Sequence, residues 1–585
     1  MRKTKIVCTM GPAVSDINVL KELVKSGMNV ARLNFSHGGY DEHKQRIEDI
    51  KKVRNELYAP VAILLDTKGP EIRIREFEEG SVNLVEGNKF VLTCNNVIGN
   101  ESIVSVTYEN LYNDIGIGDR ILLDDGLIEL KVENIVEKDI ICQVINGGML
   151  SNKKSINIPG AAISLPYLSD KDVKDIIFGI ENDVDIIAAS FVRTAYDVLE
   201  VRKVLEENGG DDIHIIAKIE NSEGVNNIDA IINVSDGIMV ARGDMGVEIP
   251  FEDLPSIQKL LIEKCYKAGK KVITATQMLD SMIRNPRPTR AETTDVANAI
   301  YDGTSAIMLS GETAIGKYPI ESVRTMSKIA EKTEKSINYK KRFHNQTIKN
   351  LTTTVASAIS HATCTTAMDL GAKAIITVTS SGATARMVSS FRPNCPIIAT
   401  TPAPKVYRQL ALSWGVIPVL SEQQKSMDDL FDHAVDKSLG TGIVKNGDLV
   451  VIAGGLPVGI SGTTNIIKAH LVGHVLAEGK GINSLSVSGK VYVAKNVRQT
   501  LEEFENGDIL VVNSTTNEYL PIIKKAKGVI VEESGMASHA AIVGMTLDIP
   551  VITGAKNATS VLKTGTIVTI DSSRGLVYSG VVKAI

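Results

Sequence analysis

Short apolar segments alternate with longer amphipathic segments over much of the chain. Each apolar segment has the length of a strand, lacks a helical period and ends in polar residues, which is typical of buried parallel strands. The segments between them have the length of helices, and Thr289 and Glu292, just after Pro288, form a capping box that starts one of them. The pattern predicts strands at residues 5–10, 29–35, 61–65, 184–190, 213–219, 237–241, 271–276 and 304–309.

Eight strands that alternate with helices predict a (β/α)8 barrel of the TIM type. We expect this catalytic barrel to occupy residues 1–69 and 168–337. In that fold the catalytic groups come from the carboxyl ends of the strands. The polar residues that end the predicted strands should therefore share one rim of the barrel.

The alternation is interrupted between residues 70 and 167. This stretch consists of short β-rich runs without a helical period, and turn signals separate the runs at 86–88, 116–119, 124–126 and 146–148. We expect it to fold as a small β-barrel inserted into the larger domain.

Residues 338–474 begin with a polar, Lys-rich linker and then resume an α/β pattern. Loops at 379–384 and 459–464 are small, polar and at helix starts, so each could bind an anion or could simply cap its helix. Two such loops in one sheet favour a phosphate-bearing ligand. The domain is predicted to be a doubly wound sheet, with strands at 374–378, 397–400 and 449–453 and helices at 352–370 and 383–391.

Residues 475–585 have a third pattern, with strands predicted at 489–494, 509–513, 528–531, 551–553 and 567–570. His539 stands at the start of a helix of small residues. A phosphoryl group on this ring would be favoured by the helix N-terminus, although a lone His more often caps or packs. Both interpretations stay open from the residues alone.

Lys218, Glu220 and Asp244 form the central candidate site, at the ends of two neighbouring predicted strands. Two carboxylates suit a hard cation such as Mg2+, and Lys218 points to the same side of its strand as Glu220. The backbone amides of residues 242–244 could add an anion site. A charged residue at one strand end is usually a solvated terminus, but several strands here end in this way. The arrangement favours phosphoryl or enolate chemistry.

The composition narrows the class of protein. The length of 585 residues suggests about four domains, and 43% hydrophobic with 23% charged residues is ordinary for a globular protein. A net charge of −5 makes nucleic acid an unexpected partner. The six cysteines have no metal-binding spacing, and no signal peptide or membrane span is predicted. We expect a cytoplasmic protein with no membrane partner.

Six motifs at the strand ends resemble those of pyruvate kinase, in the order of that family, and the resemblance extends from about residue 5 to residue 473. It implies phosphoryl transfer from phosphoenolpyruvate to ADP, giving pyruvate and ATP in the last step of glycolysis. It also implies Mg2+ (or Mn2+) and K+ as cofactors, a homotetramer, and a lid role for the inserted β-barrel. The motifs are ARLNFSHG at 31–38, DTKGPEIR at 66–73, AKIEN at 217–221, ARGD at 241–244, ATQML at 275–279 and LSGET at 309–313.

The resemblance also assigns roles to residues. Catalytic roles fall to Lys218, Arg32, Arg73 and Thr276, whose hydroxyl could relay a proton to the enolate. Substrate-binding roles fall to Arg32, Gly243, Asp244 and Thr276, and nucleotide-binding roles to Asn34, His37, Arg73 and Lys154. The implied metal ligands are Glu220 and Asp244 for Mg2+, and Asn34, Ser36, Asp66 and Thr67 for K+.

The effector loop and the tail differ from parts of their families. The loop Thr379, Ser380, Ser381, Gly382, Ala383 and Thr384 has no basic residue, so a monophosphate such as AMP or ribose 5-phosphate suits it better than a sugar bisphosphate. The tail is similar to the phosphohistidine domain of phosphoenolpyruvate-utilising enzymes, but Ala537 stands where that motif usually has Thr. We expect the tail to serve as a structural brace.

Two other classes of function remain to be separated from the kinase. A metal-enolate lyase would share Glu220 and Asp244 but would need neither the stretch at 68–73 nor a lid. A noncatalytic phosphosugar sensor would not need an intact rim. The complete set of motifs favours the kinase.

Overall fold

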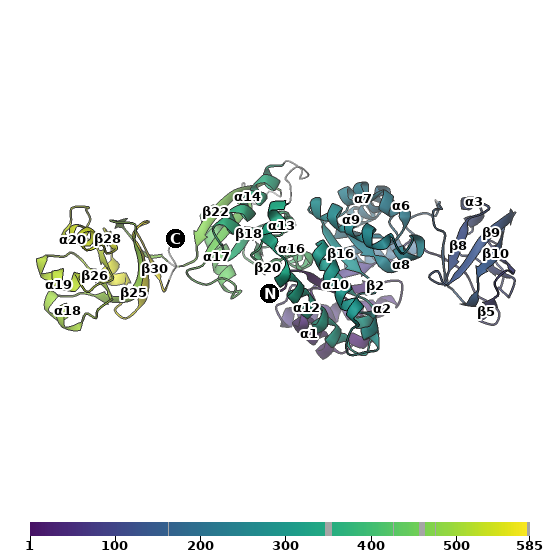
Figure 1. Ribbon diagram of the computed structural model, residues 1–585, viewed down its shortest axis with the longest axis horizontal. Helices are drawn as coiled ribbons and strands as arrows, with labels where there is room; N and C mark the ends of the chain where they lie inside the picture. Colours follow the sequence, from purple (N-terminus) through teal and green to yellow (C-terminus); the bar gives the residue numbers. More distant parts are fainter. Residues whose placement is uncertain (162, 346–353, 425, 456–461, 474, 582–585) are drawn as a thin grey trace. The chain divides into compact units, whose positions relative to one another are not determined.

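The computed structural model describes residues 1–161, 163–345, 354–424, 426–455, 462–473 and 475–581 (Figure 1). The chain divides into two compact units, which we describe separately. The first unit contains Met1–Ser357, Ser380–Asn394 and Thr401–Leu420, and the second contains Ala358–Thr379, Cys395–Thr400 and Ser421–Ile585. The domain boundaries expected from the sequence stay predictions.

Eight parallel strands in the first unit close into a barrel in the order β1-β17-β16-β15-β14-β13-β3-β2, which confirms the predicted TIM fold. β1 closes the ring because it pairs with both β17 and β2. The strands are β1 (Lys5–Thr9), β2 (Val30–Asn34), β3 (Ala62–Asp66), β13 (Ile186–Ala189), β14 (His214–Ile219), β15 (Gly237–Ala241), β16 (Lys271–Ala275) and β17 (Ala306–Leu309).

Helices follow the strands, and the termini predicted from local signals are present. Asp16 caps α1, Gly27 ends it with a positive φ, and Thr289 and Glu292 form the predicted capping box of α10. The barrel helices are α1 (Ile17–Ser26), α2 (Tyr40–Glu56), α4 (Asp170–Glu181), α5 (Ala195–Glu207), α6 (Ser222–Asn226), α7 (Ile228–Val234), α8 (Arg242–Glu248), α9 (Leu254–Lys267), α10 (Arg290–Asp302), α11 (Gly311–Ala314), α12 (Pro319–Ser336) and α13 (Tyr339–Asn345), with short 3-10 helices at Pro12–Val14 and Asp280–Ile283.

The barrel strands are buried on both faces. In β1, Ile6 and Cys8 pack in the core between strands and helices, whereas Val7 packs inside the barrel with Met239 and Ile273. Because successive side chains of a strand point to opposite faces, a strand buried on both sides needs a continuous apolar run. This requirement explains why the strands were recognisable in the sequence.

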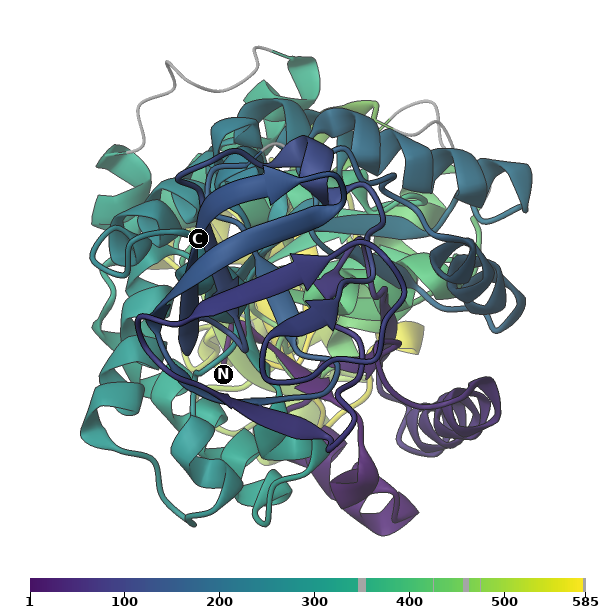
Figure 2. The ribbon, with the colours of Figure 1, turned by 90° about the vertical axis from the view of Figure 1, so that its right-hand side faces the viewer.

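The inserted lid is a closed β structure, as predicted. Its seven-stranded sheet has the order β4-β12-β8-β9-β10-β6-β7, and β11 pairs with β5. A bridge between Ile74, after β4, and Val106, after β7, joins the two edges of the sheet. The lid, drawn in blue, faces the viewer in Figure 2. Its elements are β4 (Ile72–Arg73), β5 (Ser81–Leu84), β6 (Lys89–Thr93), β7 (Ile103–Ser105), α3 (Leu111–Asp114), β8 (Arg120–Leu123), β9 (Ile128–Val136), β10 (Asp139–Asn146), β11 (Gly148–Ser151) and β12 (Ser155–Asn157).

Residues from 380–394 and 401–420 close the amino-terminal end of the barrel. Leu412 joins the apolar cluster inside the barrel, and Lys5, the first residue of β1, donates from Nζ to the Val416 carbonyl oxygen at 2.6 Å. Arg408 donates from Nε to Asp185 Oδ1 at 2.6 Å. These residues belong to α15 (Ala383–Ser390), α16 (Pro404–Gln409), a 3-10 helix (Leu410–Leu412), β20 (Val416–Leu420) and the loops between them.

The second unit contains two groups of strands. Strands β19, β18, β21 and β22 lie side by side in that order, with β22 antiparallel to β21, and another sheet has the order β23-β30-β29-β25-β26-β27-β28-β24. Residues 459–461 of the predicted loop at 459–464 lie outside the described residues. The elements are α14 (Val355–Asp369), β18 (Ala374–Val378), β19 (Ile397–Thr401), α17 (Met427–Leu439), β21 (Leu449–Gly455), β22 (Thr464–Leu471), β23 (Val475–Glu478), β24 (Lys480–Gly481), β25 (Ser486–Val493), α18 (Val497–Glu503), β26 (Ile509–Val512), α19 (Leu520–Ile523), β27 (Gly528–Val531), α20 (His539–Leu547), β28 (Val551–Thr553), α21 (Ala558–Val561), β29 (Ile567–Asp571) and β30 (Leu576–Ser579), with a 3-10 helix at Asn517–Tyr519.

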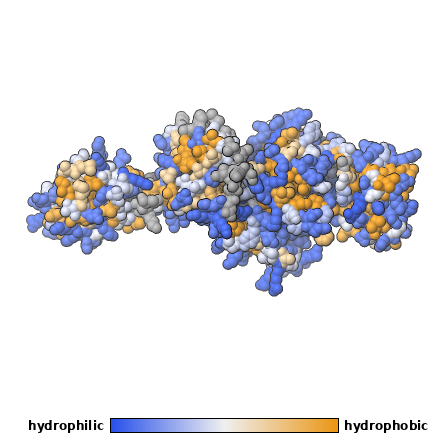
Figure 3. All heavy atoms as spheres, turned by 45° about the horizontal axis from the view of Figure 1, so that its top comes forward, coloured by the Kyte–Doolittle hydropathy of each residue, from blue (hydrophilic) through white to orange (hydrophobic). Residues whose placement is uncertain are grey.

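The surface drawn in Figure 3 mixes hydrophilic residues with smaller hydrophobic patches. Single exposed apolar side chains such as Ile98 and Leu127 are normal on a protein surface. Within the described part of the chain, no helix has both the length and the apolar character needed to cross a bilayer.

The Arg408–Asp185 pair yields a stability prediction. Arg408→Met should lower the free energy of unfolding of the first unit by about 3–5 kcal/mol, because Asp185 is buried and would lose its closest cation. Thermal and urea unfolding of the full chain would measure this change. Arg324→Met, which removes an exposed pair with Glu22, is the control and should change stability by less than about 0.5 kcal/mol. Equal effects of the two substitutions would contradict the assignment.

Candidate active site at the carboxyl ends of the barrel strands

Lys218 lies at the centre of a buried polar network. Its Nζ donates to Ser190 Oγ at 2.7 Å and lies 3.1 Å from both Asp66 Oδ1 and Glu220 Oε1. Asp66 ends β3, Ser190 follows β13, and Lys218 and Glu220 lie at the end of β14. Three adjacent strands therefore supply this cluster, as the rule for barrel rims predicts.

Asp66 also connects Lys218 with Arg32. Its Oδ2 accepts a hydrogen bond from Arg32 Nε at 2.6 Å, and Arg32 Nη1 donates to Thr9 Oγ1 at 2.9 Å. Ser190 adds a hydrogen bond from Oγ to Asp66 Oδ1 at 3.0 Å. Both oxygens of this fully buried carboxylate are bound, and two cations are fixed on either side of it.

The network keeps its members charged although they are buried. Burial alone would lower the pKa of Lys218, but the carboxylates of Asp66 and Glu220 raise it above its ordinary value. Burial opposes ionisation of Asp66 as well, yet Arg32 and Lys218 lower the pKa of this carboxyl. Asp66 and Lys218 therefore remain ionised at neutral pH.

Glu220 is a candidate metal ligand whose negative charge is only partly balanced by the groups around it. Its Oε2 accepts the Phe191 N–H at 2.6 Å, but burial raises the pKa of the carboxyl to about 8. Asp244, in the first turn of α8, is close enough to raise it further. A carboxylate pair of this kind suits Mg2+, which prefers oxygen ligands. Among the described residues, no group of three or more His, Cys, Asp and Glu side chains could hold a metal, so a cation here needs further oxygen ligands.

Thr276 and Gly243 meet at the neighbouring strand ends. The Gly243 N–H donates to Thr276 Oγ1 at 2.8 Å, and Arg242 Nη2 donates to the Thr276 carbonyl oxygen at 2.7 Å. Thr276 has φ +65°, a left-handed conformation that is costly for a β-branched residue. The sequence prediction of a strand through Thr276 was therefore wrong by one residue, since β16 ends at Ala275.

The residues expected to bind K+ come from two paired strand ends. Asn34 of β2 is the register partner of Asp66 of β3, and Asn34 Oδ1 accepts the Ser36 N–H at 3.1 Å. Thr67 Oγ1 accepts the Ser190 N–H at 3.2 Å. Asp66 thus belongs to this group of oxygens and also to the Lys218 network.

Arg73 and Lys154, which were expected to bind the nucleotide, lie close together in the lid, because Arg73 is in β4 and Lys154 directly precedes β12, the strand that pairs with β4. The Ile74 N–H donates to the Lys154 carbonyl oxygen at 2.9 Å. Arg73 Nη2 lies 2.6 Å from Glu71 Oε1, and Lys154 Nζ lies 2.7 Å from Asp124 Oδ1. Asn34 and His37 are the other expected nucleotide residues: Asn34 ends β2 of the barrel, and His37 follows that strand.

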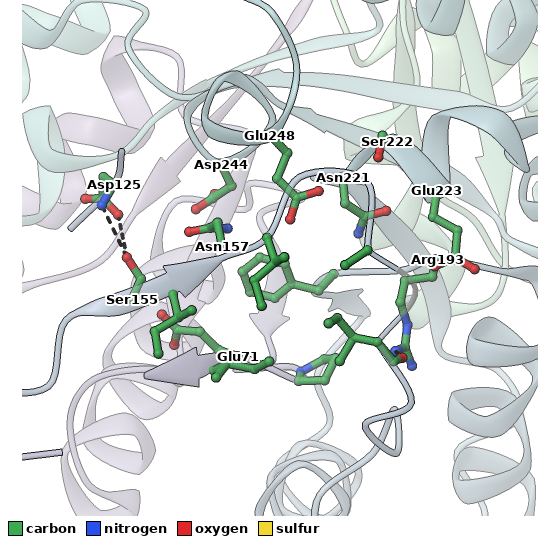
Figure 4. Close-up of a pocket in the computed structure, with 17 residues that line it drawn as sticks. Glu71, Asp125, Ser155, Asn157, Arg193, Asn221, Ser222, Glu223, Asp244 and Glu248 are labelled. Atoms are coloured by element: carbon green, nitrogen blue, oxygen red, sulfur yellow. Dashed lines mark hydrogen bonds between the residues drawn. The ribbon is translucent and has the colours of Figure 1, made fainter. Parts of the chain in front are cut away.

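A pocket beside this network is lined by lid and barrel residues (Figure 4). Asp244 and Glu248 approach it from α8 and Glu71 from the lid, while Asn157 lies next to Asp244. Burial raises the pKa of the Glu248 carboxyl to about 7 despite a hydrogen bond with Asn157. The pocket has a volume of about 110 Å³ and brings Glu71 of the lid and Asp244 of the barrel to one site.

Sequence reasoning missed Ser190 and Glu248. Ser190 was the last residue of a predicted strand, so the same strand-end rule that selected Asp66 and Glu220 would have found it. Glu248 ends α8, and its side chain reaches the lid only through the tertiary fold. No local signal in the sequence marks it.

His539 starts α20, as predicted, and both of its ring nitrogens have partners. Nδ1 lies 2.9 Å from Thr515 Oγ1, and Nε2 lies 3.1 Å from Asn517 Oδ1. Since Asn517 Oδ1 can only accept, Nε2 carries a proton, and Nδ1 pairs with the Thr515 hydroxyl. Thr515 therefore orients the ring, a role for which Ala537 has no hydroxyl.

Comparisons with known proteins identify the family. Residues 1–323 match the barrel domain of pyruvate kinase, residues 357–470 its alpha/beta domain, and residues 504–575 the mobile domain of PEP-utilising enzymes. Pyruvate kinases of Bacillus licheniformis and Geobacillus stearothermophilus are each 52% identical over 582 residues, covering 99% of both chains. The chain belongs to the pyruvate kinase family. A pyruvate kinase of Sporosarcina psychrophila is 51% identical over 582 residues, again covering 99% of both chains. This chain is therefore a phosphotransferase.

The Lys218 network predicts a selective effect on turnover. Lys218→Met should leave Mg2+ binding largely intact, because Glu220 and Asp244 remain, but should lower kcat at least ~100-fold as a fixed positive charge is lost. Steady-state kinetics and Mg2+ titration of the same preparation would separate the two effects. Lys21→Met, which removes a surface pair with Glu56, is the control and should keep kcat. A Lys218→Met variant with near-normal kcat would refute the role.

Proposed function

We propose that the chain transfers the phosphoryl group of phosphoenolpyruvate to ADP, giving pyruvate and ATP in the last step of glycolysis. The observation that carries this proposal is the buried network in which Asp66 and Glu220 hold the cations Arg32 and Lys218 at one rim of the barrel. Relatives named pyruvate kinase match over nearly the full chain, which supports the same reaction.

Arg32 and Lys218 act as cations that are in place before the reaction. Transfer of a phosphoryl group between two anions spreads negative charge over its oxygens in the transition state. Fixed positive groups stabilise that charge without having to reorganise when it develops. Arg32 donates from Nε to Asp66 and from Nη1 to Thr9. The substrate would therefore bind to Nη2 and to the second N–H of Nη1. Lys218 keeps its proton because both neighbouring carboxylates favour the ammonium form.

Glu220 and Asp244 would hold Mg2+ or Mn2+, and Asn34, Ser36, Asp66 and Thr67 would contribute to a K+ site. The donor sets fit, since both consist of oxygen atoms and the Glu220 carboxyl is buried with an incompletely compensated charge. When bound, these cations would supply positive charge to the substrate oxygens. The pyruvate kinase family generally uses both.

Thr276, Gly243 and Asp244 would position phosphoenolpyruvate. The hydrogen bond from the Gly243 N–H fixes the Thr276 hydroxyl, whose proton points to the Ala275 carbonyl oxygen at 2.6 Å. A rotation about the Cβ–Oγ1 bond would redirect that proton to the substrate and would keep the hydrogen bond from the Gly243 N–H. Thr276 is therefore our candidate for proton relay to the enolate of pyruvate.

Asn34 and His37 from the barrel and Arg73 and Lys154 from the lid would bind the nucleotide. Arg73 and Lys154 are paired with Glu71 and Asp124, so each could exchange its carboxylate partner for a phosphate. Arg binds phosphate as it binds carboxylate, through paired N–H···O bonds, and Lys binds phosphate as a point charge. ADP would thus bind to two cations that already lie close together in the lid.

A single assay separates this reaction from the two other classes of function. Formation of pyruvate from phosphoenolpyruvate, followed with a coupled dehydrogenase, should require ADP, Mg2+ and K+ together. A metal-enolate lyase would act on its substrate without ADP, and a sensor would form no pyruvate. Pyruvate formation at the same rate with and without ADP would contradict the proposal.

We further propose that a phosphorylated metabolite controls the enzyme through residues 379–384. Gly382, in this loop, directly precedes α15, and its φ of +77° lets the chain turn into the helix. The amino end of that helix favours an anion. Arg386 Nη1 donates to the Ser381 carbonyl oxygen at 2.9 Å and shapes the loop. With no basic residue in the loop itself, a monophosphate such as AMP or ribose 5-phosphate suits it.

A homotetramer in the cytoplasm, with the tail as a brace, is part of the same proposal.

Ser381→Glu should abolish activation, because its carboxylate would occupy the position of the phosphate with a like charge. We expect the half-saturating phosphoenolpyruvate concentration to fall on addition of AMP or ribose 5-phosphate in the wild type and to stay constant in the variant. Ser381→Gln, of similar size but neutral, is the matched control and should retain part of the response. Full activation of Ser381→Glu would exclude this loop.

A further inference from the structure

The chain returns from the lid to the barrel through residues 163–166, which we call the lid connection. Ile163 and Leu165 pack against the apolar core of the lid. Tyr167, directly after the connection, is buried in the core of the barrel, where its hydroxyl donates to the Ser190 carbonyl oxygen at 2.9 Å. The chain therefore passes from one hydrophobic core to the other within a few residues. A barrel residue that binds this connection also restrains the lid.

Arg193, in the loop between β13 and α5, binds the lid connection from the barrel. Its Nη1 donates to the Ile163 carbonyl oxygen at 2.7 Å, and its Nη2 donates to the Leu165 carbonyl oxygen at 3.0 Å. Between these two residues, the Ser164 N–H donates to Asp114 Oδ2 of the lid at 2.8 Å. Successive residues of the connection are thus held by the barrel, by the lid and by the barrel again.

The barrel also fixes Arg193 itself. The Arg193 N–H donates to Asp197 Oδ2 at 2.8 Å, and Asn227 Nδ2 donates to the Arg193 carbonyl oxygen at 3.0 Å. Arg193 Nε lies 3.6 Å from the same Asp197 oxygen, and the side chain is 17% exposed. A planar guanidinium oriented in this way can present its two Nη groups to two carbonyl oxygens at once, which a lysine ammonium cannot do with the same geometry.

The loop that carries Arg193, residues 190–193, also contacts the Lys218 network. Ser190 Oγ accepts a hydrogen bond from Lys218 Nζ at 2.7 Å. The next residue, Phe191, donates from its N–H to Glu220 Oε2 at 2.6 Å. One short loop therefore contacts both the candidate active site and the connection that leads to the lid.

We propose that Arg193 is a positioning residue, which fixes the lid relative to the barrel and thereby raises the affinity for the nucleotide. Arg193 lines the pocket in Figure 4, but both of its Nη groups have carbonyl partners, which points to positioning rather than to substrate contact. The proposed nucleotide site combines two barrel residues with Arg73 and Lys154 of the lid, so the effect on affinity rests on the proposed function. A lid that is already held in place has less conformational freedom to lose when ADP binds.

Distances between the lid and the barrel test the positioning role without any reaction. Nitroxide labels introduced by Met149→Cys on β11 and Lys203→Cys on α5, both exposed positions, would report this distance in the full chain by pulsed electron paramagnetic resonance. Cys395, the one native cysteine that is not buried, is replaced by Ser to avoid a third label. Arg193→Met should broaden the distance distribution, because the lid connection loses both contacts. Arg193→Lys should broaden it less, and an unchanged distribution in Arg193→Met would overturn the proposal.

Steady-state kinetics separate the effects on the two substrates. Arg193→Met should raise the KM for ADP about tenfold, whereas the KM for phosphoenolpyruvate, whose proposed binding residues all belong to the barrel, should change less than about twofold. Bound ADP itself holds the lid, so kcat at saturating ADP should stay within about threefold of the wild type. Arg193→Lys should recover part of the affinity for ADP. Equal increases of both KM values would contradict positioning through the lid.

A wild type that forms no pyruvate would refute the proposed function instead, and the distance distribution alone would then decide the role of Arg193.

Arg202→Met is the matched control. Arg202, on α5, donates from Nη1 to the Ile213 carbonyl oxygen at 3.0 Å and from Nη2 to Asp236 Oδ2 at 2.8 Å, and its side chain is 22% exposed. Both of these partners belong to the barrel. The control should lower the melting temperature about as much as Arg193→Met does, but should leave the distance distribution and both KM values unchanged. If Arg202→Met broadens the distribution or raises the KM for ADP to the same extent, Arg193 has only a general structural role and the proposal fails.

Discussion

The buried carboxylate of Asp66 is the interaction on which the candidate active site depends. A carboxylate without solvent is stable only when its oxygens are paired with charges and hydrogen bonds in good geometry. Here Arg32, Lys218 and Ser190 meet that requirement from three other strands. The same contacts that stabilise Asp66 also fix the two cations, so the stability of the rim and its readiness for phosphoryl chemistry have a common origin.

Much of the barrel could be predicted because its signals are local. A strand buried on both faces is apolar throughout, and the change to polar residues marks where it ends, as at Asp66 and Glu220. The conformation of Thr276 could not be predicted, since its left-handed backbone depends on Arg242 from a neighbouring segment. Closure of the lid through Ile74 and Val106 likewise joins residues whose pairing no local pattern specifies.

Buried positive charge is balanced differently at the two ends of the barrel. At the carboxyl end, Lys218 contacts two carboxylates and Arg32 contacts one, so the protein itself neutralises most of their charge. At the amino end, Arg392 is buried against aromatic rings and backbone carbonyl groups, without an acidic partner in the described structure. The first group is therefore suited to catalysis with added metal ions, whereas the second holds Arg392 in place by stacking and hydrogen bonds.

Closure of the barrel has a consequence for the synthesis of the chain. The first strand, β1, pairs on one side with β17, and Cys8 has Leu309 as its register partner. At typical translation rates the ribosome needs about 15–60 s to make the ~300 residues between them. During that time the apolar edge of β1 has no partner strand, and exposed strand edges promote aggregation. The nascent chain is therefore a natural client for chaperones until β17 emerges and seals the ring.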